Sequence, residues 1–290
     1  MALPARWGSA LVLSFVLALG LPACGKKSST PRAQVAQYVS QVNHMVTALT
    51  PPLTTVTRIS AQVSAKRGES LLGQTPLVSD ESQLNAALNQ IDLQERRLRA
   101  LPAPAQAAHL RSLVLRLTSD QSALTHQLSL LVAFLPRFNS VVAPLQPALL
   151  RLEKVLSERQ ANGAAAVSAL YAAKAVALRR FQATTTKIMG RLRPLVPPAV
   201  SKPAFEAQLG SLRGMGASAG KLAGALAGGS PGNVRPLLID FDRAALATHS
   251  KAVQKRQIAA IRAYDAQSRE LTTLSEAIAR ERLRLSNTVK

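Results

Sequence analysis

The side chain with the richest chemistry in this 290-residue chain is the thiol of Cys24, the only cysteine. A lone cysteine cannot form an intrachain disulfide and excludes the paired-cysteine spacings of structural zinc sites. Residues 1–6 before it carry one positive charge, residues 7–19 form an apolar run, and residues 20–23 are mostly small. This order is typical of a secretory signal peptide, and its apolar run is too short for a permanent membrane span.

The stretch Leu21-Pro22-Ala23-Cys24 resembles the lipobox of bacterial lipoproteins. Leu21 and Ala23 match that pattern, whereas Pro22 departs from it, because Ala or Ser is more usual there. The resemblance covers residues 1–27 and implies cleavage before Cys24 and a diacylglyceryl group on its sulfur. Two fatty-acid chains, such as palmitate, hold a protein durably, since each buried methylene contributes about 0.8 kcal/mol. The lipobox resemblance further implies an extracytoplasmic position on the cell membrane. With Gly25 in place of Asp, the outer membrane is favoured in a cell that has one.

We therefore expect a lipoprotein signal peptide at residues 1–23, a lipidated polar tether at 24–31 and a helical domain at 32–290. The tether contains Lys26 and Lys27, which suit an anionic headgroup region. Sub-boundaries within the helical domain are predicted near residue 136 and at 228–233, where prolines or glycines interrupt the apolar pattern. We expect no apolar run after the leader to cross a membrane.

The helical domain shows helical periodicity of apolar residues nearly throughout and no convincing two-residue alternation. Leucines between residues 110 and 131 keep close to a seven-residue repeat, which predicts a coiled-coil-like seam. We expect an all-α fold, an elongated bundle of long antiparallel helices joined by turns that proline and glycine mark. Helix ends are predicted at Pro102, Pro136 and Pro194, and one long last helix at about 236–284.

Two further patterns concern the packing and the origin of these helices. Glycines recur between residues 210 and 220 within an apolar helical stripe that no strand precedes, which favours close helix packing over a phosphate-binding loop. Residues 101–113 and 196–212 share a proline-rich start and a similar leucine spacing, about 95 residues apart. An internal duplication and the independent use of proline at helix starts both explain this likeness.

The sequence lacks the motifs and residue spacings that are typical of catalytic or metal-binding sites. The histidines His44, His109, His126 and His249 form no pair at helical ligand spacing, and the HExxH motif is absent. The nucleophile motif GxSxG, the phosphate-binding loop and the dinucleotide fingerprint are absent as well. We therefore expect no enzyme, no metal and no other cofactor.

Positive charge is the remaining candidate for function. The formal net charge is +21, and residues 146–290 hold 23 basic against 9 acidic residues. A field of one sign attracts anionic partners without specifying them. The candidate residues for an anionic partner are Lys174, Arg179, Arg180, Lys187, Arg191 and Arg193. At 100° per residue, Arg180, Lys187 and Arg191 share the face opposite the apolar stripe. Lys174 lies within that stripe, either as a snorkelling side chain at its edge or as a buried cation for an acidic ligand.

These features lead to two functional hypotheses. The first is a lipid-anchored extracytoplasmic binding or scaffold protein whose basic C-terminal half docks to anionic lipid, to a wall polymer or to a partner protein. The alternative is a ligand-binding accessory lipoprotein of a transport system, with a pocket between helix pairs. An ordinary solvated face remains a third interpretation of the basic residues. Nucleic acid is not an expected partner, because aromatic residues for base stacking are scarce and the chain carries an export signal.

Overall fold

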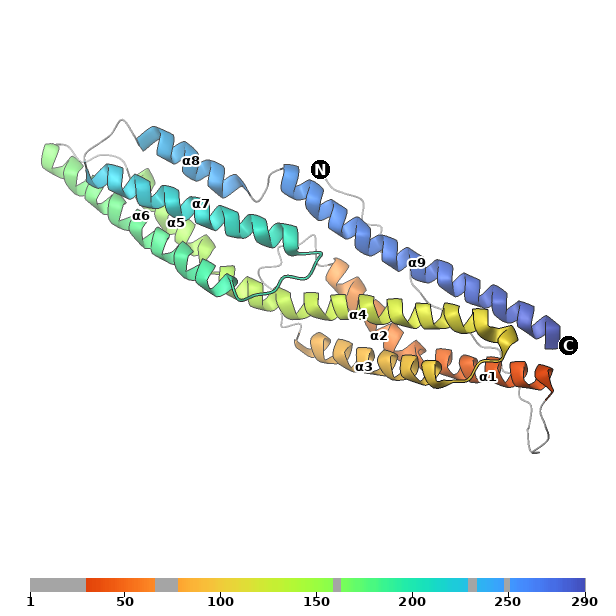
Figure 1. Cartoon of the computed structure of the whole chain (residues 1–290). Coiled ribbons are helices and arrows are strands. Elements are labelled where there is room, and N and C mark those ends of the chain that lie inside the picture. The colour runs from red at the N-terminus through yellow and green to blue at the C-terminus, as the bar shows by residue number, and fades with distance from the viewer. Residues whose placement is uncertain (1–29, 66–77, 159–162, 229–233, 248–250, 290) are drawn as a thin grey trace. The chain divides into compact units, whose positions relative to one another are not determined.

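The computed structural model describes residues 30–65, 78–158, 163–228, 234–247 and 251–289, which are mainly helical and contain no strand (Figure 1). The all-α helical fold is therefore confirmed. Cys24, the signal peptide and the tether up to residue 29 lie outside the described residues. The helices are α1 (Pro31–Ala48), α2 (Thr50–Ala65), α3 (Val78–Ala100), the short 3-10 helix η3 (Ala105–Ala107), α4 (Ala108–Val142), α5 (Leu145–Ser157), α6 (Ala164–Leu192), α7 (Lys202–Ala227), α8 (Val234–Leu246) and α9 (Lys251–Val289).

The chain divides into two compact units. Unit 1 comprises residues up to Val132 together with Arg262–Lys290, and unit 2 comprises Ala133–Ile261. Both divisions fall inside helices, the first within α4 and the second within α9. The first division lies close to the sub-boundary predicted near residue 136, whereas residues 228–233 lie inside unit 2.

The core of unit 1 is built from one apolar face each of α1, α3, α4 and α9. Leu110, Leu117 and Leu124 are buried at intervals of seven residues, in keeping with the predicted seam along α4. Polar contacts also join the helices of this unit. Arg116 of α4 pairs with Glu270 of α9, and the Ser122 hydroxyl donates to the Asp92 carboxylate of α3 at 2.7 Å.

A buried carboxylate near the end of α9 adds a further link in unit 1. Arg284 donates to both oxygens of Glu281, with Nε–Oε2 at 2.8 Å and Nη2–Oε1 at 2.6 Å. This hydrogen bonding holds the pKa of the Glu281 carboxyl below its ordinary value, although burial opposes the shift. The same guanidinium donates to the carbonyl of Gln106, just before α4, at 3.3 Å. Glu281 therefore fixes an arginine that ties α9 to the start of α4.

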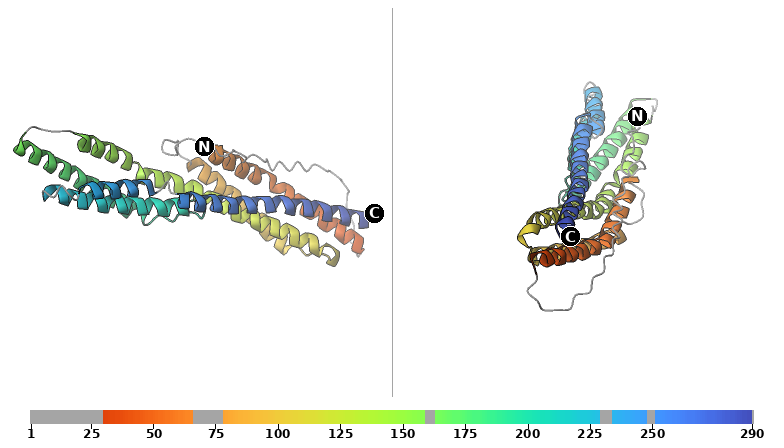
Figure 2. Two further views of the ribbon diagram at one scale, coloured as in Figure 1. Left: turned by 90° about the horizontal axis from the view of Figure 1, so that it is seen from above. Right: turned by 90° about the vertical axis from the view of Figure 1, so that its right-hand side faces the viewer.

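In unit 2, α7 packs between α6 and α8, and α5 packs on α6 (Figures 1 and 2). Phe181 of α6 meets Phe241 of α8 edge-on, with ring centroids 5.6 Å apart. The other large buried side chains come mainly from α6 and α7: Leu178, Ile188, Leu192, Phe205, Leu212, Met215 and Leu222.

Glycines let α7 approach both of its neighbours. A Cβ added at Gly214 would lie 2.8 Å from the Ala244 Cβ of α8. One added at Gly216 would lie 2.7 Å from the Thr185 hydroxyl oxygen of α6, and one at Gly220 would meet the Gln182 amide of α6. The prediction of close helix packing is confirmed at these three positions, whereas an added Cβ at Gly210 would meet nothing within 4 Å.

Two predicted helix boundaries were wrong. Pro136 does not end a helix, because α4 runs through it to Val142. Proline lacks the N–H that would reach the carbonyl of residue 132, so one hydrogen bond is lost at the division between the units while the helix continues. The predicted single helix at 236–284 is two helices, α8 and α9. Their apolar residues serve different cores, since Phe241 is buried in unit 2 and Ile278 in unit 1.

Asp240 and Asp242 lie in the second half of α8 and not at its N-terminus, where acids would favour the helix dipole.

The α4 sequence brings a further correction. A stretch within Ala105–Ser157 is long and apolar enough to cross a membrane by length and composition, with mean hydropathy 1.6. Residues of α4 such as Leu117 and Phe134 are buried in the two cores, a use of apolar residues that equally explains this composition.

The structure gives a place to the proposed repeat without testing it. Residues 101–104 connect α3 to η3 and α4 in unit 1, and residues 196–199 connect α6 to α7 in unit 2. Each copy thus precedes a long helix, and the duplication stays a prediction. Two polar residues interrupt the apolar stripes of α4 and α9: Gln121 is buried and Ser268 is half-buried. The side chain of Gln257 lies outside the description.

Candidate anionic-ligand face

Helix α6 carries the predicted basic residues. Gly163 precedes it with φ at 110°, in a region that glycine adopts readily and other residues rarely do. One face of α6 is buried, and it consists of four large side chains at helical spacing: Leu178, Phe181, Ile188 and Leu192. The helix ends before Pro194, where the Arg193 N–H donates to the Met189 carbonyl at 3.1 Å. The buried face fixes the rotation of α6 and thereby determines which residues reach solvent.

Three cations lie along the solvent face of α6. Arg180, Lys187 and Arg191 are exposed, and they share one side of the helix by its 100° period. They span about 16 Å at a rise of 1.5 Å per residue. Arg179, which directly precedes Arg180, and Arg193, which directly follows α6, are exposed as well. We call these five residues the α6 basic face.

No acidic side chain pairs with the α6 basic face among the described residues. Of the ion pairs described, only Arg243–Asp240 of α8 lies in unit 2. Exposed Arg213 and Lys221 on α7 add to the positive charge, and Glu206 is the one acid between residues 174 and 235. The cations are therefore available to an external anion, and their spread over a convex helix suits an extended anionic surface rather than one small ion.

Lys174 has a different role from the other candidates. Its Nζ donates to the carbonyl of Leu156 at 2.9 Å and to that of Glu158 at 3.0 Å. These carbonyls lie at the C-terminal end of α5, where the last carbonyls have no helical partner and the dipole favours a cation. The half-buried Lys174 thus ties α6 to the end of α5 and does not belong to the α6 basic face.

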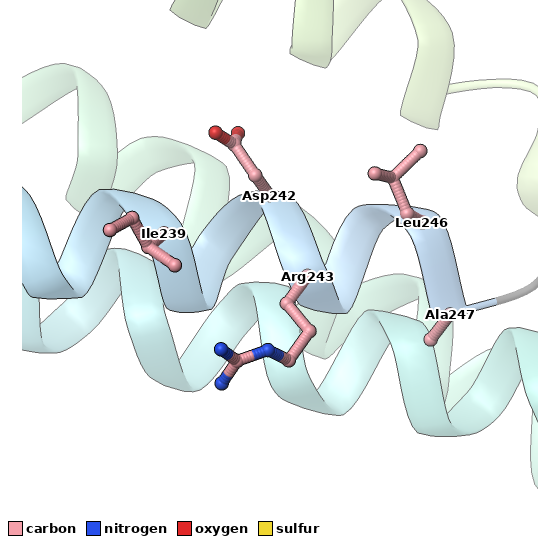
Figure 3. A pocket seen from close by; sticks show the side chains of 5 residues that line it. All are labelled: Ile239, Asp242, Arg243, Leu246 and Ala247. Atoms are coloured by element: carbon pink, nitrogen blue, oxygen red, sulfur yellow. The ribbon is translucent and has the colours of Figure 1, made fainter.

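Helix α8 carries a surface feature that the sequence analysis missed. An open hollow of about 640 Å³ lies over its outer side, lined by Ile239, Asp242, Arg243, Leu246 and Ala247 (Figure 3). All five residues come from one stretch of chain, so this hollow is not the enclosed pocket between helix pairs that a ligand-binding accessory lipoprotein would need. The signal in the sequence was a helix with apolar residues on two opposite sides.

The histidines are the next candidates for catalysis or metal ligation. His44, His109 and His126 are exposed, and His249 lies outside the described residues. Within the described part of the chain, no group of three or more His, Cys, Asp or Glu side chains could hold a metal ion.

Comparison with known proteins adds no assignment. No protein-family model matches the chain. No curated protein and no solved structure matches it either.

Proposed function

We propose that this chain is a lipid-anchored extracytoplasmic helical protein whose basic C-terminal half docks to an anionic component of the cell envelope. In this proposal, residues 1–23 are removed, Cys24 carries the lipid, and the tether up to residue 31 joins the membrane to the helical domain. The docking surface is the α6 basic face, which contacts anionic lipid headgroups or an anionic wall polymer. The protein acts as a binding or scaffold protein, and we assign it no catalytic step.

The observation that supports docking is the set of exposed cations on α6 without acidic partners. An exposed Lys or Arg near an anionic membrane contributes about 1 kcal/mol. Arg180, Lys187 and Arg191 together would then contribute about 3 kcal/mol, or about a hundredfold in affinity. Salt screens such contacts, because the Debye length falls from about 10 Å at 0.1 M to about 3 Å at 1 M.

The test of docking uses the chain from Gly25, which lacks the anchor, and sedimented vesicles with or without phosphatidylglycerol. We expect binding to the anionic vesicles at low salt and release at high salt. Replacing Arg180, Lys187 and Arg191 by Gln should weaken binding far more than replacing Arg32, Arg97 and Arg280, exposed cations of unit 1. An equal loss in both triple variants would show that net charge, and not this face, governs binding. Binding to neutral vesicles that persists at high salt would contradict the proposal.

The anchor has its own test, because docking and lipidation can fail separately. Mass spectrometry of the mature protein should find an N-terminal Cys24 with a diacylglyceryl mass. Cys24→Ser should block cleavage by the lipoprotein route, so the variant should carry no diacylglyceryl mass and no N-terminus at residue 24. An unmodified Cys24, or an uncleaved start in the parent chain, would refute the anchor while leaving the docking surface untouched.

A further inference from the structure

Two exposed apolar side chains accompany the α6 basic face. Val176 is 45% exposed and precedes Arg180 by about one helical turn. At 100° per residue, Arg180, Lys187 and Arg191 all lie within about 60° of Val176, so it shares their side of α6. Val196 lies in the connection from α6 to α7 (Figure 1). It is 86% exposed, more than any other large apolar residue that the structure describes.

The connection from α6 to α7 holds Val196 outward. Leu195 packs against the core of unit 2, and Pro198 is buried. The Leu195 N–H donates to the Leu192 carbonyl at 2.9 Å, and the Ser201 N–H donates to the Pro198 carbonyl at 2.9 Å. Three prolines between residues 194 and 198 restrict φ further. A loop fixed in this way loses little conformational freedom when a partner covers its tip.

The remaining exposed residues on this side of α6 are small. They are Ala165, Ala169, Ala172, Ala173, Ala183 and Gly190. No acidic residue occurs anywhere in α6. A single exposed valine is common on protein surfaces. Here, however, two valines accompany a row of cations on a surface without acids, which is the combination of basic and apolar residues that membrane-interface segments carry.

We infer that the anionic component at the α6 basic face is a lipid bilayer, and that Val196 at the tip of the α6–α7 connection enters its surface. Because the cations supply the attraction, this insertion rests on the docking proposed above and names lipid as the partner. A soluble anionic polymer would pair with the cations and leave both valines in water. A bilayer accommodates both groups, since it offers anionic headgroups to the cations and an apolar boundary to the valines.

The spacing along the chain permits this arrangement. Val196 follows Arg193 by three residues, so their Cα atoms are at most about 11 Å apart. Interfacial segments bury their apolar side chains about 5–10 Å deep. Arg193 can therefore keep its guanidinium among the headgroups, with its apolar stem along the boundary, while Val196 lies deeper.

A tryptophan at the loop tip tests the position of this residue directly. The single tryptophan of the sequence is Trp7, which the chain from Gly25 lacks, so Val196→Trp supplies the only indole. Its emission should shift to shorter wavelengths when vesicles with phosphatidylglycerol are added, and lipids brominated on their acyl chains should quench it. The control is Leu283→Trp, because Leu283 of α9 is 64% exposed and belongs to unit 1. Its emission should change in neither assay.

Serine variants measure what the valines contribute to binding while the net charge stays constant. Burial of a whole valine side chain corresponds to about a tenfold change in affinity. We expect Val196→Ser to weaken sedimentation with the anionic vesicles by up to about tenfold, Val176→Ser to weaken it less, and Leu283→Ser to leave it unchanged. Circular dichroism of every variant should match the parent.

Failure of docking and failure of insertion give different results. If the parent chain does not sediment with anionic vesicles, docking to lipid is refuted and insertion with it; binding to polyphosphate in that case would indicate a polymer as the partner. If the parent sediments but the Val196→Trp emission stays unchanged, the loop remains in water. Insertion alone is then overturned, as it is if Val196→Ser and Leu283→Ser bind equally well.

Discussion

The glycines of α7 allow a prediction in which the same substitution changes sign along one helix. Alanine is favoured over glycine in a helix interior by about 1 kcal/mol. At Gly210 an added Cβ would meet nothing within 4 Å. Gly210→Ala should therefore raise the free energy of unfolding of unit 2 by up to about 1 kcal/mol.

At Gly214 the same change should destabilise unit 2. The new Cβ would lie 2.8 Å from the Ala244 Cβ and 3.8 Å from its Cα, so no rotation of a side chain can relieve the overlap. Helices α7 and α8 must then move apart, which also strains the hydrogen bond from the Ser211 hydroxyl to the Ala244 carbonyl at 2.7 Å. Overpacking costs about 1–3 kcal/mol. After the gain in helix propensity, we expect a net loss of about 1 kcal/mol.

Alanine at Gly216 or Gly220 should change the free energy of unfolding by an amount between those expected for Gly210→Ala and Gly214→Ala. The atom that opposes a Cβ at Gly216 is the hydroxyl of Thr185, a fully buried, β-branched side chain with few alternative rotamers. At Gly220 it is the end of Gln182, a flexible side chain that can turn away. Gly216→Ala should therefore destabilise unit 2 modestly, and Gly220→Ala should be close to neutral.

Urea unfolding of the chain from Gly25, followed by circular dichroism, measures these differences. Peptide-level hydrogen exchange assigns them to α7, which matters because two units need not unfold in one step. The reasoning fails if Gly210→Ala and Gly214→Ala shift stability in the same direction. It also fails if Gly220→Ala proves more harmful than Gly214→Ala.

Three further predictions concern polar side chains. Lys174→Met should remove the two hydrogen bonds to the end of α5 and lower the free energy of unfolding by about 1 kcal/mol. Amide exchange in the last turn of α5 should become faster. The control Lys187→Met should change neither the stability nor this exchange. Because its folded-state pKa is lowered, Glu281 stabilises unit 1 above the ordinary carboxyl pKa and loses this effect as pH falls through the lowered value. Glu281→Gln should thus be less stable than the parent at pH 7 and similar near about pH 2, in unfolding followed against pH. Gln121→Leu should stabilise unit 1 by about 1 kcal/mol in urea unfolding, because the buried amide oxygen of Gln121 has no hydrogen-bond partner among the residues that the structure describes. An unchanged or lower midpoint would contradict this.

Much of the helical layout was predictable because its signals are local. Apolar periodicity gave the fold class, and the ends of α3 and α6 fall just before Pro102 and Pro194 as predicted. Pro136 was misleading because a proline removes only one hydrogen bond, and apolar residues on both sides of it are buried in the two cores. The separation of α8 from α9 was missed because Leu246 fits the spacing of the α9 stripe while it is in fact exposed.

The candidate site was predictable to the extent that it depends on one helix. The exposure of Arg180, Lys187 and Arg191 follows from the period of α6 and its apolar stripe alone. The contact of Lys174 with the end of α5 depends on where two helices lie in space, which periodicity does not contain. The outer face of α8 was missed for a similar reason, since only the position of Phe241 in the core shows which apolar side remains exposed.

The two units use charge differently, and this difference makes the basic half suited to binding. Unit 1 uses some of its acidic residues to join helices, as in the pair of Arg116 with Glu270, so replacing those acids removes contacts between helices. Unit 2 joins its helices through apolar side chains, through glycines such as Gly216 and through the Ser211 hydroxyl. Lys174 also joins α6 to the end of α5, whereas the five cations of the α6 basic face take no part in these contacts. They can therefore be replaced with little effect on stability, and a loss of binding in such variants reports on docking itself.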